Sequence, residues 1–142
     1  DLLNEPYFER PPPKSTGTQH FSSTWLQTRL NSRQGLSAAR VQAALMALTC
    51  QTVVDAIHRH APDTDRILVC GGGVHNTTLM QRLRQLSGLP VESTATYGID
   101  PDWMEAMAFA WLAQRTLSGK PGNLPAVTGA AGARILGTIH PA

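Results

Sequence analysis

The chain has 142 residues, which is the length of one domain and enough to bury a hydrophobic core without disulfides. Apolar residues make up 42% and charged residues only 15%, and this balance excludes an intrinsically disordered chain. With 12 basic and 10 acidic residues the formal net charge is +2. The basic residues are scattered, so no dedicated nucleic-acid surface is indicated.

The cysteines and the apolar runs bear on the cellular setting. Cys50 and Cys70 lie in apolar stretches, where we expect buried, inert thiols, which are compatible with a reducing compartment. The longest apolar run, Ala106–Ala113, is far shorter than the ~20 residues of a membrane-spanning helix, so no membrane partner is expected. The sequence starts without Met, at Asp1, and we expect it to be a fragment of a longer protein.

The leading segment, residues 1–35, is expected to be extended or irregular. Residues 1–17 are expected to be irregular, because Pro11-Pro12-Pro13 cannot enter a helix and the fixed φ of proline favours an extended segment there. A short helix is predicted around Ser22–Leu30, followed by a turn over Asn31–Gly35.

Residues 36–142 are expected to form a compact α/β core. Ser37 is a good N-cap for a long helix with a wide apolar face, which Pro62 ends after His60. The elements predicted after it are a buried strand at Arg66–Cys70, a glycine turn at Gly71–Gly73, a helix at Thr77–Leu86, a strand at Pro90–Thr94, a helix from Pro101 to about Leu117 and a strand near Arg134–Ile139. The helix after Pro101 is apolar almost all round, so we expect it to be central.

This order of elements predicts an α/β fold, with a twisted sheet and helices on its faces. The strongest local feature is the transition from a buried strand through Gly71-Gly72-Gly73 into a helix. Glycines permit close approach of a ligand, and a helix start offers free N–H groups to an anion, so a nucleotide or phosphate site is one interpretation. A tight turn without a ligand is the other. The loop lacks the Gly-Lys-Ser/Thr of a Walker motif and has Asn76 where a dinucleotide fingerprint needs Gly or Ala.

Two further segments carry polar side chains in unusual surroundings. Glu105 is the lone charge on the apolar helix, and it is either a functional carboxylate in a polar cleft or a helix-capping charge. Lys14, Ser15 and Thr16 beside Gly17 could hold an anionic group or form an ordinary solvated loop. The histidines are dispersed and interpreted as surface or cap residues, and no metal site is expected in the chain.

The motifs, taken in order, resemble the C-terminal half of the anhydro-N-acetylmuramic acid kinase family. The segments that carry the resemblance are Phe8, Pro12–Gly17 with Phe21, Val69–Gly73 with Asn76, Leu79 and Met80, Gly98, Met104–Ala106 with Ala108–Ala113, and Pro121–Pro125 with Val127–Ala130. Each motif alone is modest, but the ordered set is specific and spans nearly the whole chain.

The resemblance implies one lobe of an actin-like, ribonuclease H-like ATPase and sugar-kinase fold, a mixed sheet with helices on both faces and ATP between two lobes. It implies ATP- and Mg²⁺-dependent phosphorylation of 1,6-anhydro-N-acetylmuramic acid at O6, with water opening the anhydro ring, in cytoplasmic recycling of cell-wall sugar. The family's general base and phosphate-binding loop belong to its N-terminal half, so no catalytic residue is expected here and the chain alone is expected to be inactive.

The same resemblance implies roles for particular residues. Gly71, Gly72, Gly73 and Asn76 match the loop on the adenosine side of the ATP site. Glu105 matches a sugar-contacting glutamate, and Lys14, Ser15 and Thr16 match a segment that faces the cleft. The alternative is a non-catalytic nucleotide-binding or dimerisation module of the same superfamily.

Overall fold

Two short parallel strands form the sheet around which the chain is organised. The computed structural model describes residues 2–31, 33 and 35–140. Strand β1 (Ile67–Val69) pairs with β2 (Val91–Ser93), with Val69 opposite Ser93. Both strands lie within segments predicted to be strands. Because they are parallel, their carboxyl ends meet at the same edge of the sheet.

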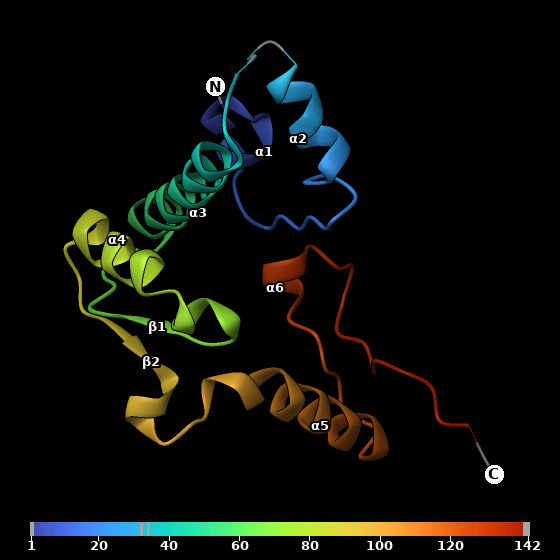
Figure 1. Ribbon diagram of the computed structural model, residues 1–142. Helices are drawn as coiled ribbons and strands as arrows, with labels where there is room; N and C mark the ends of the chain where they lie inside the picture. Colours follow the sequence, from blue (N-terminus) through green and yellow to red (C-terminus); the bar gives the residue numbers. More distant parts are fainter. Residues whose placement is uncertain (1, 32, 34, 141–142) are drawn as a thin grey trace.

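The long helices α3 (Ala38–His60) and α4 (Thr77–Ser87) pack beside this sheet (Figure 1). Ser37 begins α3 as predicted, because its Oγ accepts the backbone N–H of Arg40 at 3.4 Å. The bounds of both helices agree with the ranges expected from sequence. The mixed α/β class is therefore confirmed.

The buried core joins both helices to one face of the sheet. Its fully buried members, each at most 5% exposed, are Cys50, Val54, Leu83 and Val91. Ile67 and Val69 of β1 pack against this core, whereas Leu68 between them is 47% exposed on the other face of the sheet. The expectation of a mixed sheet covered on both faces is wrong for the described residues, which form a parallel sheet covered on one face. Both helices lie on the same face, because Cys50 and Val54 of α3 share one buried cluster with Leu83 of α4 and Val91 of β2.

The leading segment is more helical than the prolines suggested. It contains a 3-10 turn η1 (Leu2–Asn4), one helical turn α1 (Pro6–Glu9) and helix α2 (Ser23–Leu30). Pro6 occupies the first position of α1, where its missing N–H costs nothing. The helix α2 confirms one prediction, whereas the irregular backbone expected throughout residues 1–17 is wrong. Positions 1, 32 and 34, and so part of the turn expected over Asn31–Gly35, lie outside the described residues.

One carboxylate ties this segment together. Glu5, only 7% exposed, accepts hydrogen bonds from Arg29 at 2.8 Å, Trp25 Nε1 at 2.9 Å and His20 Nε2 at 3.2 Å. These bonds, that from Trp25 above all, lower the pKa of Glu5, against the opposing effect of desolvation. The carboxylate thus holds the first turns of the chain against α2.

Helix α5 (Met104–Leu117) is preceded by two 3-10 turns, η3 (Thr94–Tyr97) and η4 (Pro101–Trp103). It is not central, contrary to its composition: Phe109 is 65% exposed and Trp111 53%. A helix that is apolar on all sides is normally buried against other parts of a protein. The described residues leave much of the apolar surface of α5 exposed.

The tail after α5 folds back toward the N-terminal segment (Figure 1). It contains the short helix α6 (Pro125–Thr128), and a Cβ added at Gly129 would lie 3.5 Å from Cγ of Pro13. The strand predicted near Arg134–Ile139 is absent from the described chain, because no neighbouring strand offers that stretch a ladder of hydrogen bonds.

The expectation of two buried cysteines is confirmed for only one of them. Cys50 is buried as predicted, but Cys70 is exposed, because β1 ends at Val69 and the thiol lies in the turn beyond the core. No helix among the described residues is long and apolar enough to cross a membrane.

Candidate functional site: the glycine turn at the carboxyl edge of the sheet

The glycine turn follows β1 directly and has a conformation that requires glycine. Gly71 has φ +68° and ψ −171°, a region essentially closed to other residues. Its N–H donates to the carbonyl of Pro101 at 2.8 Å, which joins the turn to the start of η4. A Cβ added at Gly71 or Gly72 would meet nothing within 4 Å, so the turn is open on that side.

The turn does not enter α4 directly as expected. A short 3-10 helix η2 (Gly72–His75) intervenes, because the N–H groups of Val74 and Asn76 bond back to the carbonyls of Gly71 and Gly73. Asn76 then caps α4, with its Oδ1 accepting the N–H of Leu79 at 3.0 Å. The side-chain oxygen of Asn76 therefore has a structural partner within the fold.

A histidine and an aspartate form a second link between the residues after the glycine turn and η4. His75 Nε2 lies 2.8 and 3.0 Å from the two carboxylate oxygens of Asp102, linking η2 to η4. Both side chains are more than half exposed. The sequence interpretation treated His75 as a surface residue and missed the pair, because 27 positions separate its members.

Glu105 lies in the first turn of α5, one helical turn beyond Asp102. It is exposed, and within the described chain its carboxylate has no hydrogen-bond or ion-pair partner. Since η4 is bonded to the glycine turn through Pro101 and Asp102, the structure brings the start of α5 beside that turn.

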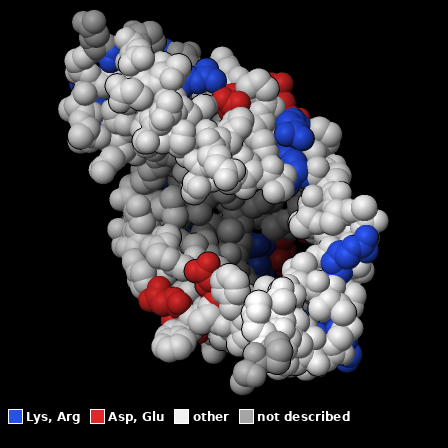
Figure 2. All heavy atoms as spheres, turned by 90° about the vertical axis from the view of Figure 1, so that its right-hand side faces the viewer, with Lys and Arg blue, Asp and Glu red and all other residues white. Residues whose placement is uncertain are grey.

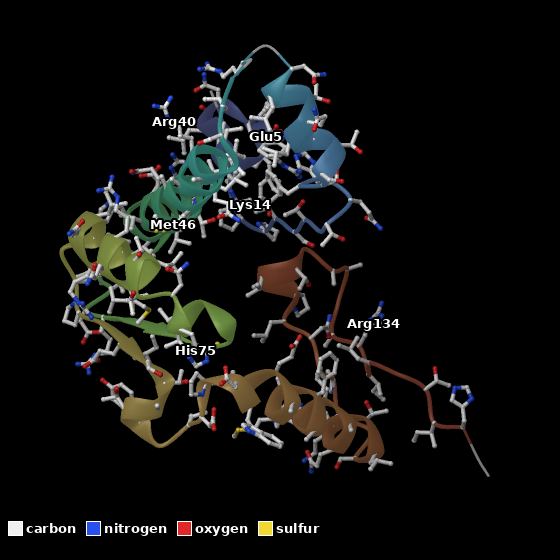
Figure 3. All side chains as sticks on the ribbon, in the orientation of Figure 1. Glu5, Lys14, Arg40, Met46, His75 and Arg134 are labelled. Carbon is white, nitrogen blue, oxygen red and sulfur yellow. The ribbon has the colours of Figure 1, made fainter. Side chains whose placement is uncertain are left out.

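Lys14 lies elsewhere. Its Nζ donates to the carbonyls of Tyr7 and Phe8, both at 3.1 Å, and lies 4.9 Å from the Tyr7 ring centre. Figure 3 shows Lys14 among the N-terminal helices and His75 on the part of the molecule that carries the sheet. Ser15 and Thr16 are exposed beside it. The structure thus does not bring this segment into contact with the glycine turn.

The surface between the Lys14 segment and the residues around the glycine turn is concave. Figure 2 shows a deep hollow between the N-terminal helices and the part of the chain that contains α5. A separate apolar cavity of about 640 Å³ lies between α5 and the tail, lined by residues such as Phe109, Leu112, Leu136 and Ile139. The cavity does not include the glycine turn.

A parallel strand that ends in an open glycine turn at the carboxyl edge of its sheet is typical of the α/β class, in which that edge is the usual place for a ligand. The family model for anhydro-N-acetylmuramic acid kinase matches residues 1–142. The chain belongs to this family, and the resemblance inferred from its motifs is confirmed.

Curated relatives give the same result. The chain is 54% identical over 142 residues to an anhydro-N-acetylmuramic acid kinase of Xylella fastidiosa, covering 99% of this chain and 37% of that protein. It is 50% identical over 141 residues to one of Pseudomonas fluorescens, covering 99% and 39%. It is 49% identical over 143 residues to one of Nitrosomonas europaea, covering 100% and 39%. The chain thus spans 37–39% of the length of these relatives.

Proposed function

We propose that this chain is the C-terminal, nucleotide-side lobe of an ATP-dependent kinase that phosphorylates 1,6-anhydro-N-acetylmuramic acid while the anhydro ring is opened by water. Residues 1–35 are its leading segment and residues 36–142 its α/β core, within an actin-like sugar-kinase fold. The products are N-acetylmuramic acid 6-phosphate and ADP, and the cytoplasm is the proposed compartment.

The observation that carries this proposal is the bonded corner formed by the glycine turn and the start of α5. Gly71 and His75 on one side hold Pro101 and Asp102 on the other. A nucleotide at the turn and a sugar at Glu105 would therefore be held by one connected unit. Phosphoryl transfer depends mainly on such positioning of two substrates.

The charges around the turn favour the nucleoside end of ATP. Residues 67–81 and 91–105, which contain the two strands and the turns that follow them, include no Lys or Arg. The second of these ranges instead carries Asp100, Asp102 and, at the start of α5, Glu105. A phosphate chain beside these carboxylates would be repelled, whereas ribose hydroxyls and base nitrogens can use neutral donors and acceptors.

The chain's own residues contribute binding rather than proton transfer. Gly71, Gly72 and Gly73 let the nucleoside approach the backbone, and Glu105 accepts hydrogen bonds from sugar hydroxyls. We assign the general base and the phosphate-binding loop to the remainder of the full-length protein. The Lys14–Thr16 segment is assigned to the cleft wall.

Mg²⁺ would neutralise phosphate charge in such a reaction. Within the described ranges no three His, Cys, Asp or Glu side chains gather closely enough to hold a metal ion. The residues present do not fit a Mg²⁺ site of their own, so we assign none of them as its ligand.

A coupled assay of ADP release with anhydro-N-acetylmuramic acid tests the proposal. The full-length protein should turn over, and the isolated 142 residues should not, because half of a cleft cannot align both substrates. Turnover by the isolated chain would contradict the assignment of the base to the remainder of the protein.

A second candidate rests on exposed apolar side chains of α5, among them Phe109, Trp111 and Leu117, which are 65, 53 and 75% exposed. Exposed apolar surface of this kind favours a non-catalytic binding or dimerisation module. Light scattering with nucleotide titration separates the two functions. Self-association of the full-length protein that millimolar ATP leaves unchanged, together with absent turnover, would favour the module.

A further inference from the structure

The hydroxyl of Thr94 is buried without a partner. Thr94 is 6% exposed, and among the described residues its Oγ1 is the buried side-chain polar atom that makes no hydrogen bond. Buried hydroxyls are almost always bonded, and one left unbonded makes folding less favourable. A threonine here, where valine has the same shape, therefore calls for a partner outside the described chain.

The position of Thr94 relates this hydroxyl to the glycine turn. Thr94 follows Ser93, which lies opposite Val69 in the parallel register, so Thr94 and Cys70 leave the sheet together at its carboxyl edge. Gly71 follows Cys70 directly in the sequence.

Two backbone hydrogen bonds connect Thr94 to the glycine turn through residues 99–101. The N–H of Ile99 donates to the carbonyl of Thr94 at 3.2 Å, and two residues later Pro101 accepts the N–H of Gly71. The segment 99–101 thus spans from Thr94 to the glycine turn. The unbonded hydroxyl lies in the same corner as the proposed nucleotide loop.

We propose that Thr94 is a nucleotide-binding residue whose hydroxyl hydrogen-bonds the nucleoside portion of the bound nucleotide. This inference rests on the proposed function of the glycine turn. A threonine hydroxyl both donates and accepts, which suits ribose hydroxyls and ring nitrogens. The absence of Lys and Arg from residues 67–81 and 91–105 disfavours a phosphate at this position.

The test uses the full-length protein with Thr94→Val, Thr94→Ser and, as a matched control in the same turn, Thr96→Val at an exposed position. Isothermal titration should give an ADP affinity about tenfold weaker for Thr94→Val, because its apolar isostere leaves a nucleoside group unpaired. Thr94→Ser and Thr96→Val should bind like the wild type. Without nucleotide, Thr94→Val should unfold at the same temperature as the wild type or higher.

The outcomes separate the two proposals. If the wild type binds no ADP, the nucleotide function of the turn fails, and this inference fails with it. If the wild type binds ADP and Thr94→Val binds it equally well, only the assignment of Thr94 is overturned. A Thr94→Val protein that unfolds earlier without nucleotide would overturn it too, since the hydroxyl would then bond another part of the protein. Adenosine should reproduce the loss seen with ADP, and a loss confined to ADP would contradict the nucleoside contact.

Discussion

His75 and Asp102 hold the glycine turn to η4, the 3-10 turn directly before the helix that carries Glu105. The imidazole Nε2 lies 2.8 and 3.0 Å from the two carboxylate oxygens, and the bond from Gly71 N–H to the Pro101 carbonyl runs beside it. Two contacts between the same pair of turns restrict their relative movement. A substitution in either turn should therefore affect binding at both proposed positions, the nucleotide at the glycine turn and the sugar at Glu105.

We predict that Asp102→Ala in the full-length protein raises KM for both ATP and the sugar, severalfold each. The cost in stability should stay below about 1 kcal/mol, because both side chains are more than half exposed. Steady-state kinetics with each substrate varied in turn measures the effect, and Asp63→Ala, an exposed aspartate elsewhere, is the charge-matched control. Asp102→Asn keeps an acceptor for the histidine and should recover most of the loss. Unchanged KM values in Asp102→Ala would mean that the pair does not position the substrates.

A second prediction concerns Glu5 and acid. Its pKa is lowered from 4.5, chiefly by the hydrogen bond from Trp25 and also by those from His20 and Arg29. Because the folded state favours the ionised form, the carboxylate adds stability above pH 4.5 and loses it as the pH falls through the lowered value. Glu5→Gln should therefore lower the urea midpoint at neutral pH, and the gap to wild type should narrow below that pH.

Urea unfolding from pH 7 downward measures this gap, with the exposed Glu9→Gln as the control from the same segment. The control should follow the wild type throughout. A gap for Glu5→Gln that is constant with pH would show that the carboxylate acts through shape alone.

The helices were predictable from sequence because their signals are local. Ser37 and the apolar spacing after it determined α3, and the strand followed by glycines determined where the turn lies. The contacts of Glu5 were not predictable, since its three donors lie 15, 20 and 24 positions away along the chain. The periodicity of apolar residues gives no information about contacts between residues so far apart in the sequence.

The errors have physical causes as well. The composition of α5 indicated a covered helix but could not say which part of the protein covers it. The stretch around Ile135 is apolar enough for a strand, but a strand needs a neighbour to pair with, and a single stretch cannot reveal whether one exists. At the site, Gly71 could be identified by its residue type, whereas His75 with Asp102 depends on a tertiary approach of two turns.

The third prediction separates the structural role of Asn76 from its proposed binding role. Asn76→Ala removes the acceptor for the Leu79 N–H and should cost about 1 kcal/mol of unfolding free energy. Asn76→Asp keeps that acceptor and should be nearly as stable as wild type. If the side chain also contacts the nucleotide, Asn76→Asp should still weaken ADP binding, because it replaces the amide donor by a negative charge. Thermal unfolding and ADP titration on the same samples measure both, and normal ADP affinity in Asn76→Asp would restrict Asn76 to helix capping.

The fourth prediction uses the difference between two neighbouring glycines. Gly71→Ala places a side chain at φ +68° and should cost about 1–3 kcal/mol of stability, whatever binds there. Gly72 has no such φ, and an added Cβ meets nothing within 4 Å, so Gly72→Ala should fold as well as wild type. A nucleoside against the backbone would fill that open space, so the added methyl should raise KM for ATP tenfold or more and leave the unfolding temperature unchanged. Gly17→Ala, equally unhindered in the leading segment, is the control and should leave KM for ATP as it is. An unchanged KM for ATP in Gly72→Ala would mean that the open side of the turn faces solvent in the working enzyme, and that the turn serves only to reverse the chain.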